Sequence, residues 1–215
     1  LSSCDAGTFK AAHTVNYGGT SSCGVCSNDQ YSDAGAASCT SCSTSNGYTN
    51  SGTTAASHAG IASCKATCAA GTYVATAGSA CTTVGTGYWG AGGTVSQNAT
   101  LGRTQCPANY RDGAAASSES GCQTSCAAGT YVATAKAACT SVGTGYYRAA
   151  HSVNYGSTST RNQCPAGYRD GAAAAAENGC TMSVGGGKYL GTAKGTTLSS
   201  CDAGTFKAAH TVNYG

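Results

Sequence analysis

Four cysteines have the spacing that most resembles a chemical site in this chain. They lie in Cys23-Gly-Val-Cys26 and Cys39-Thr-Ser-Cys42, two CxxC pairs separated by twelve residues. Such a spacing is typical of a zinc ribbon, in which four thiolates hold the metal. The same cysteines could instead close two disulfide loops that meet end to end. We favour the disulfides, because the chain holds 15 cysteines and related segments lack the CxxC spacing.

Histidine and aspartate side chains give no second candidate site. His13, His151 and His210 occupy one position of a repeated segment, AAH(T/S)VNYG, with no carboxylate or cysteine at a ligand-like spacing. We therefore interpret them as turn residues. Asp112 and Asp170 lie in two copies of the tetrapeptide YRDG and are also predicted to form turns.

Other patterns argue against further functional classes. The eight acidic residues include no pair suited to a glycosidase cleft, and the Gly-rich run at 184–187 lacks the Gly-Lys-Ser/Thr of a phosphate-binding loop. The net charge is +3 and the 11 basic residues are scattered, so we expect no nucleic-acid binding. No segment is apolar enough to span a membrane. We expect no enzyme activity, no metal and no cofactor.

The elements that carry these residues belong to a repeat. Residues 1–18 recur letter for letter as residues 198–215, so the sequence has a period of 197 residues. We expect a slice of a tandem array whose partners are further copies of the same repeat, since repeats of this kind form extended structures.

Composition predicts what holds each repeat together. Only 17 of 215 residues are Leu, Ile, Val or Phe, about 8%, which is too few for a conventional apolar core. Cys4 and Cys201 are the same repeat position, so one unit has 14 cysteines, an even number. Disulfides are therefore expected to replace the missing core, and they persist only in oxidising compartments. We predict a secreted or cell-surface protein.

A shorter repeat of 58 residues lies inside the unit. CAAGTYVATAGSAC from Cys68 returns as CAAGTYVATAKAAC from Cys126, and CPANYRDG from Cys106 returns as CPAGYRDG from Cys164. A further copy begins at Val184, which replaces the first cysteine, and it continues in the segment that opens the chain. The predicted modules are 1–41 (the end of a 55-residue module), 42–67, 68–125, 126–183 and 184–215.

Parsimony suggests how the cysteines pair. If the first cysteine of each module pairs with the second and the third with the fourth, the loss at Val184 and the gain of Cys23 explain each other. Four cysteines alone allow three connectivities, so other pairings stay open. In this scheme residues 29–39 correspond to the segment that follows Cys106. The predicted pairs are Cys4–Cys23, Cys26–Cys39, Cys42–Cys64, Cys68–Cys81, Cys106–Cys122, Cys126–Cys139 and Cys164–Cys180.

The predicted fold is a set of small disulfide-rich modules with short β-strands and turns, stacked into an elongated tandem-repeat rod with little helix. TYVAT, GTGYY and HSVNYG have the Tyr/Val/Thr content and flanking glycines of short strands. Residues 172–177 favour at most one helical turn, which ends at Gly179. Tyrosines recur in every module and are expected between neighbouring modules, with the hydroxyl bonded to backbone.

Several positions could carry glycans. Asn98-Ala-Thr100 is an N-glycosylation sequon and predicts an exposed loop. Ser/Thr clusters at 20–22, 157–160 and 196–200 are candidates for O-linked sugars. Covalent glycans would help so uncharged a surface to stay soluble.

The module strings show a resemblance to known proteins. CAAGTYVATAKAACT, CPAGYRDGAAAAAENGC and CSNDQYSDAGAASCTSC resemble the CxxGTY…C and CPAGY…C modules of cysteine-rich surface proteins, such as ciliate immobilisation (surface) antigens and growth-factor-receptor-like repeats. Val184 departs from that pattern. The resemblance implies an extracellular, elongated, non-enzymatic coat or filament protein, and it brings no catalytic residues.

These observations favour a structural subunit of an extracellular, glycosylated fibre or cell-surface coat, with neighbouring fibre chains as further partners. The alternative is the stalk of an adhesin or receptor ectodomain whose binding domain lies outside this sequence. A fibre benefits from identical units, whereas a binding module tolerates divergence, so the identical 18-residue segments favour the fibre.

Overall fold

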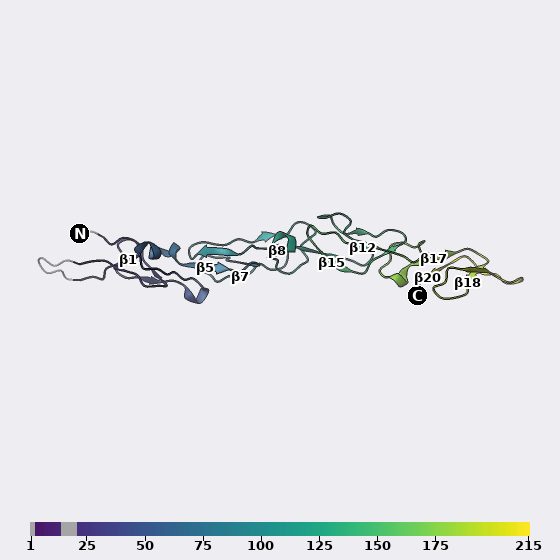
Figure 1. The fold of residues 1–215 in the computed structure, drawn as a ribbon, viewed down its shortest axis with the longest axis horizontal. Coiled ribbons are helices and arrows are strands. Elements are labelled where there is room, and N and C mark those ends of the chain that lie inside the picture. The colour runs from purple at the N-terminus through teal and green to yellow at the C-terminus, as the bar shows by residue number, and fades with distance from the viewer. Residues whose placement is uncertain (1–2, 14–20) are drawn as a thin grey trace. The chain divides into compact units, whose positions relative to one another are not determined.

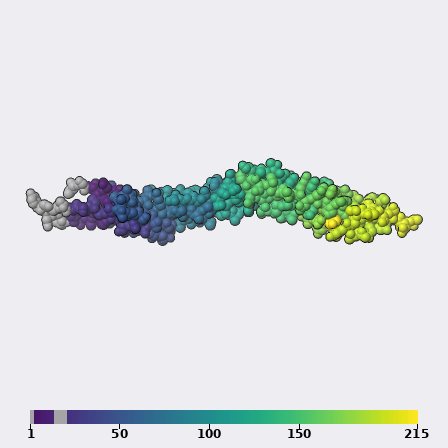
Figure 2. Space-filling view, in the orientation of Figure 1, coloured from purple at the N-terminus to yellow at the C-terminus, as the bar shows by residue number. Residues whose placement is uncertain are grey.

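The computed structural model of the chain describes residues 3–13 and 21–215. Its regular structure there consists of strands of two to four residues and short 3-10 turns, with no α-helix in these ranges. The chain forms two compact units, Leu1–Gln105 with Ala115–Ser118, and Cys106–Ala114 with Glu119–Gly215 (Figure 1). Within each unit the colour changes gradually over the surface, so spatial neighbours are close in sequence (Figure 2).

Every strand pairs antiparallel with one partner, and three kinds of pair recur. The longest kind joins four residues to four. Its members are β5 (Lys65–Cys68) with β9 (Gly93–Ser96), β11 (Gln123–Cys126) with β15 (His151–Asn154), and β17 (Thr181–Val184) with β20 (His210–Asn213). One face of each pair is buried and the other exposed, as the alternation in β11 shows.

The second kind is a hairpin inside a short loop. Its members are β3 (Gln30–Tyr31) with β4 (Thr40–Ser41), β6 (Thr72–Tyr73) with β7 (Thr82–Thr83), β12 (Thr130–Tyr131) with β13 (Thr140–Ser141), and β18 (Lys188–Leu190) with β19 (Leu198–Ser200). A disulfide between cysteines 13 residues apart closes the first three hairpins. The fourth has Val184 and Leu198 at these positions and forms without a bridge.

The third kind pairs a strand that follows a hairpin loop with a strand that lies directly before the next disulfide-closed loop. Its members are β1 (Thr8–Phe9) with β2 (Gly24–Val25), β8 (Tyr88–Trp89) with β10 (Thr104–Gln105), and β14 (Tyr146–Tyr147) with β16 (Asn162–Gln163). The strands predicted in TYVAT, GTGYY and HSVNYG are therefore present as β6 and β12, β14, and β15.

In the part of the chain that the structure describes, helical structure is limited to single 3-10 turns. They are η1 (Thr44–Asn46), η2 (Ala55–His58), η3 (Ile61–Ser63), η4 (Glu119–Gly121) and η5 (Glu177–Gly179). The turn predicted over 172–177 exists, but it begins only at Glu177, because Ala176 is extended and Ala174 forms a bridge with Tyr147 instead. The fold class is confirmed as small disulfide-stapled modules of short antiparallel strands. The stacking of these modules into a rod stays a prediction.

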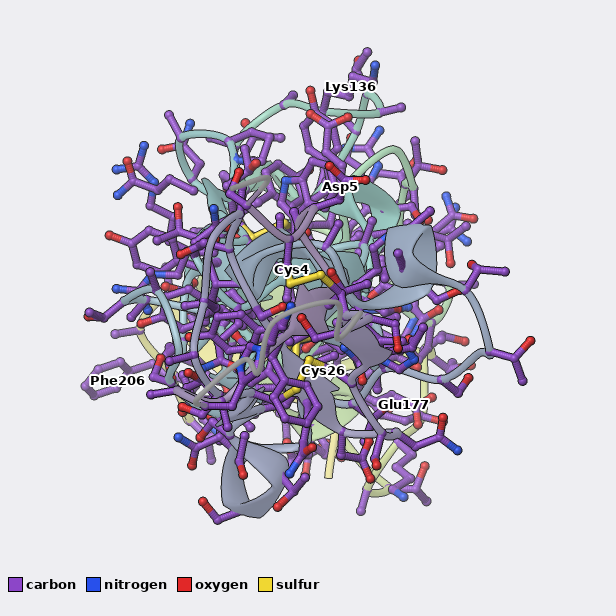
Figure 3. All side chains as sticks on the ribbon, turned by 90° about the vertical axis from the view of Figure 1, so that its left-hand side faces the viewer. Cys4, Asp5, Cys26, Lys136, Glu177 and Phe206 are labelled. Carbon is purple, nitrogen blue, oxygen red and sulfur yellow. A yellow bond between two sulfur atoms is a disulfide. The ribbon has the colours of Figure 1, made fainter. Side chains whose placement is uncertain are left out.

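Seven disulfides join the pairs derived from the sequence, with Cα–Cα distances of 5.6–5.8 Å. Figure 3 labels Cys4 and Cys26, each with a yellow sulfur–sulfur bond. The Cys26–Cys39 loop combines features of both kinds of loop. It spans 13 residues and holds a hairpin, as Cys68–Cys81 does. The amide of Cys26 donates to Gly7 and that of Lys10 to Ala36, just as Cys164 donates to Gly145 and Arg148 to Ala174, so these contacts agree with the predicted correspondence to the segment after Cys106 and Cys164.

The core is assembled from disulfides, valines and tyrosines. Its fully buried large side chains include Tyr48, Tyr110, Tyr168, Val74, Val84, Val132, Val142 and Val184. One cluster gathers Cys164, Tyr168, Cys180, Met182 and Val184, with Leu190 and Leu198 packed against it. Each such cluster is small, so no single patch of apolar area could hold the chain folded without its bridges.

Candidate functional site

The recurring feature with a clear task is the junction between predicted modules. Tyr48, Tyr110 and Tyr168 are each fully buried. Each hydroxyl donates to a backbone carbonyl of the following module: Tyr48 to Ser79 at 3.1 Å, Tyr110 to Ala137 at 2.7 Å, and Tyr168 to Gly195 at 2.8 Å. The three acceptors are equivalent positions in the 58-residue repeat. For these three tyrosines the predicted hydrogen bond from hydroxyl to backbone is confirmed, while the module boundaries that they would cross stay a prediction.

A second tyrosine completes two of these junctions. Tyr110 meets Tyr155 edge to face with ring centroids 5.1 Å apart, and Tyr168 meets Tyr214 in the same way at 5.0 Å. The ammonium of Lys136 lies 5.2 Å from the Tyr155 ring centroid. Such pairs add about 0.5–1.5 kcal/mol beyond the area they bury.

Lys136 and its counterpart Lys194 adopt a backbone conformation that is unfavourable for lysine. Lys136 has φ 69° and Lys194 has φ 58°, the left-handed region that is unfavourable for residues with a Cβ. In the first junction the equivalent residue is Gly78, with φ 80°. That junction is polar, since Gln97 replaces the second tyrosine and accepts a hydrogen bond from the amide of Ser43 at 3.0 Å.

Burial keeps the hydroxyls of Tyr48 and Tyr110 in the donor form. It raises the pKa of Tyr48 and of Tyr110 above the usual value of 10.0, and the neighbouring Tyr155 phenol adds to the shift at Tyr110. Loss of hydration disfavours the charged phenolate, so both phenols stay protonated at neutral pH.

The tetrapeptide that begins at Tyr110 has a contact for every residue. Arg111 Nε donates to the carbonyl of Cys106 at 2.9 Å, and Asp112 Oδ2 accepts from the amide of Ser125 at 2.8 Å. Gly113 lies so close to Gln123 that a Cβ would meet its side chain at 2.9 Å. The copy at Tyr168 repeats these contacts, with Arg169 bonded to Cys164 and Asp170 to Ser183. Both aspartates therefore anchor a distant strand, which is more than the turn predicted for them.

An arginine clamp holds the third kind of strand pair. Arg161 Nη1 donates to the carbonyl of Val142, and its guanidinium lies 3.8 Å from the Tyr146 ring centroid. Arg103 makes the same contacts with Val84 and Tyr88. Both clamps join residues 19 apart, and the Cys4–Cys23 disulfide also spans 19 residues beside the equivalent pair β1–β2. Neither arginine was predicted to have this role, although the shared 19-residue spacing signals it.

The clamp and the bridge should therefore be interchangeable. We expect Val142→Cys with Arg161→Cys to form an eighth disulfide, because positions 142 and 161 correspond to Cys4 and Cys23. A loop of this length contributes about 3 kcal/mol, comparable to a cation–π contact plus one charged hydrogen bond, about 2–5 kcal/mol. Stability should thus change little. Arg161→Ala alone removes both contacts and should cost about 2–5 kcal/mol.

Maleimide mass tagging under denaturing conditions counts the free thiols, and urea unfolding gives the stability. The equivalence would be refuted by two additional reactive thiols in the double variant, with a stability loss as large as that of Arg161→Ala.

The four cysteines with zinc-ribbon spacing serve other purposes. Cys23 is bonded to Cys4, Cys26 to Cys39, and Cys42 to Cys64, so none of the four offers a thiolate. Within residues 3–13 and 21–215 no three His, Cys, Asp or Glu side chains gather as metal ligands.

The repeated histidines bind their own backbone. His13, His151 and His210 each place Nδ1 2.9–3.0 Å from the carbonyl two residues earlier. An open groove of about 440 Å³ lies beside His151, lined mainly by Ser and Thr. Asp170 is not among its lining residues, so His151 and Asp170 do not share a site.

The predicted glycan sites are at the surface where the structure describes them. Asn98 and Thr100 are exposed, and Asn98 lies in a turn directly after β9. The cluster at 196–200 is exposed except for Leu198. In the cluster at 157–160, Ser159 is engaged by the Val132 amide and by His151. Thr20 lies outside the described residues.

No described helix is long and apolar enough to cross a membrane. Comparison of the chain with protein-family models, with curated proteins and with solved structures finds no match in any of the three. What the residues establish is therefore coarser than a family: a disulfide-rich chain of repeated small β-hairpin modules whose seven bridges indicate an oxidising, secretory or extracellular environment.

Proposed function

We propose that this chain is a structural building block of an extracellular fibre or cell-surface coat, built from tandem copies of the 197-residue repeat. The observation that carries the proposal is the junction. Three successive modules each use a buried tyrosine to bond to the next one at an equivalent carbonyl. A junction that works between consecutive modules of one chain can be extended without limit, which suits a fibre.

The chemistry of the described side chains agrees with a passive role. The aspartates and arginines of both YRDG segments bond to backbone, and the histidines of the AAH segments do the same. We propose no catalytic function, because these residues are occupied in holding strands together. The resemblance to cysteine-rich surface antigens points in the same direction.

Chains with one, two and three repeats test the proposal. If each repeat adds to a fibre, the maximum dimension from small-angle X-ray scattering should grow by the same increment with each copy. The native protein should also appear as filaments or a coat in electron micrographs of the cell surface. A dimension that grows only as the cube root of the mass would contradict the fibre. A native protein with a large non-repeat domain at one end would support a stalk instead.

The surface of such a fibre should carry sugar at Asn98. We expect the native protein to bear an N-linked glycan there, because the sequon is exposed in a turn that an oligosaccharyltransferase could reach. Peptide mass spectrometry before and after enzymatic deglycosylation measures its occupancy. Thr100→Ala should abolish the modification and leave the Asn98 side chain in place. An unmodified Asn98 throughout the native material would remove glycosylation at this position from the proposal.

A further inference from the structure

The chain contains one sequence in two environments, at residues 4–10 and 201–207. Both copies form the same local turn. Thr8 Oγ1 donates to the carbonyl of Asp5 at 2.7 Å and Thr205 Oγ1 to that of Asp202 at 2.8 Å, while Gly7 and Gly204 both have φ near 85°. The segment therefore takes its shape from its own residues, and any further difference comes from what covers it.

The first copy is covered on one side by residues 23–36. β1 pairs with β2, and Cys4 is bonded to Cys23. The amide of Gly7 donates to Ser32 at 2.9 Å, the amide of Lys10 donates to Ala36 at 3.2 Å, and the carbonyl of Gly7 accepts from Cys26 at 3.0 Å. Cys4 and Thr8 are consequently buried.

Among the described residues, contacts hold the second copy on the opposite side only. The carbonyl of Lys207 accepts from the amide of Gly187 at 2.8 Å, as Arg148 does from Gly129. Nothing in the described structure lies within 4 Å of a Cβ placed on Gly204, and Cys201 is a free thiol. Phe206 is 90% exposed and points outward in Figure 3, whereas its counterpart Phe9 is half-buried and lies against Gly24.

Residues 201–207 already have the shape of residues 4–10, and the first copy shows which segment covers that shape. We propose that residues 201–207 form the docking surface for the following copy of the repeat. Its residues 23–36 would pair with Thr205–Phe206 as β2 pairs with β1, and its Cys23 would bond to Cys201. The inference rests on the proposed tandem array, and it names the contact by which one 197-residue unit joins the next.

The covalent step is an oxidation. Two thiols, Cys201 and the added Cys23, lose two protons and two electrons and form one sulfur–sulfur bond. The oxidant is a disulfide, such as an oxidised thiol–disulfide oxidoreductase or glutathione disulfide, which is reduced to two thiols. The strand pairing comes first in this scheme, because it brings the two sulfur atoms into the geometry seen for Cys4 and Cys23.

The test compares the present chain with one extended after Gly215 by a second copy of residues 19–125. Ser22→Thr in the added copy labels its mass. In the extended chain we expect the peptide with Cys201 to be linked to the labelled Cys23, and the amides of Gly204 and Lys207 to exchange at least about tenfold more slowly. In the present chain Cys201 should react with iodoacetamide.

A matched control separates the effect of strand pairing from that of the Cys201–Cys23 disulfide. With Cys23→Ser in the added copy, Cys201 stays a thiol, but the two amides should remain protected. A free Cys201 and unprotected amides in the extended chain would overturn the proposal, as would Cys201-linked dimers of the present chain, which would make a separate molecule the partner. Filament imaging of the native protein is independent of these readouts, so the fibre proposal and the junction can fail separately.

Discussion

Replacing Cys106 by Val and Cys122 by Leu is expected to unfold the surrounding module, whereas the same replacements at Cys126 and Cys139 should leave the β12–β13 hairpin folded. The two loops span 16 and 13 residues, so the loss of loop-closure entropy is nearly equal, about 3 kcal/mol in each. The difference must come from burial. Cys106 and Cys122 are both buried, but Cys139 is half-exposed.

One hairpin of the chain already lacks its disulfide and carries apolar residues in its place. Val184 and Leu198 stand where the β12–β13 region has Cys126 and Cys139, and β18 still pairs with β19 over three residues. Val184 is buried, so its side chain fills the space of the lost sulfur. At position 122, by contrast, the site is fully buried, so a leucine would overpack it at a cost of about 1–3 kcal/mol beyond the lost bridge. The sum of about 4–6 kcal/mol approaches the whole stability of a small domain.

Hydrogen exchange of the module amides and urea unfolding measure both variants. We expect protection to be lost around β11 and β15 in the first variant and to persist in β12 and β13 in the second. Equal destabilisation by the two pairs would show that burial does not distinguish the two kinds of bridge.

Tyr110→Ala is expected to cost about 3–5 kcal/mol, as is usual for a fully buried aromatic side chain. The substitution removes the edge-to-face contact with Tyr155 and the hydrogen bond to Ala137. Tyr110→Phe keeps the ring, so it should cost about 1–3 kcal/mol, the penalty for the carbonyl left without its donor.

The matched control is Tyr189→Ala, because Tyr189 is 40% exposed in a hairpin strand and the change should cost below about 1 kcal/mol. Urea unfolding of the oxidised protein gives the three values. Hydrogen exchange near Ala137 reports whether the junction itself has opened. A similar loss for Tyr110→Ala and Tyr189→Ala would mean that the buried tyrosine does not hold neighbouring modules together.

The local pattern determined a large part of this structure. The 58-residue repeat, the short Tyr/Val/Thr strands and the parity of the cysteines predicted the hairpin modules and the seven disulfide pairs. These features were readable because each bridge joins cysteines only 13–22 residues apart. Loop closure over so short a span leaves few alternatives, and strand or turn propensity acts over a few residues.

The contacts between segments were decided only by the tertiary structure. The carbonyl that receives each tyrosine hydroxyl lies 27–31 residues away and carries no side-chain signal. The role of Arg161 depends on the Val142 carbonyl and the Tyr146 ring arriving together. The hairpin inside the Cys26–Cys39 loop was likewise seen only from the observed register of β3 and β4. Backbone acceptors are the same at every residue, so the sequence names the donor, and only the folded chain shows which carbonyl it reaches.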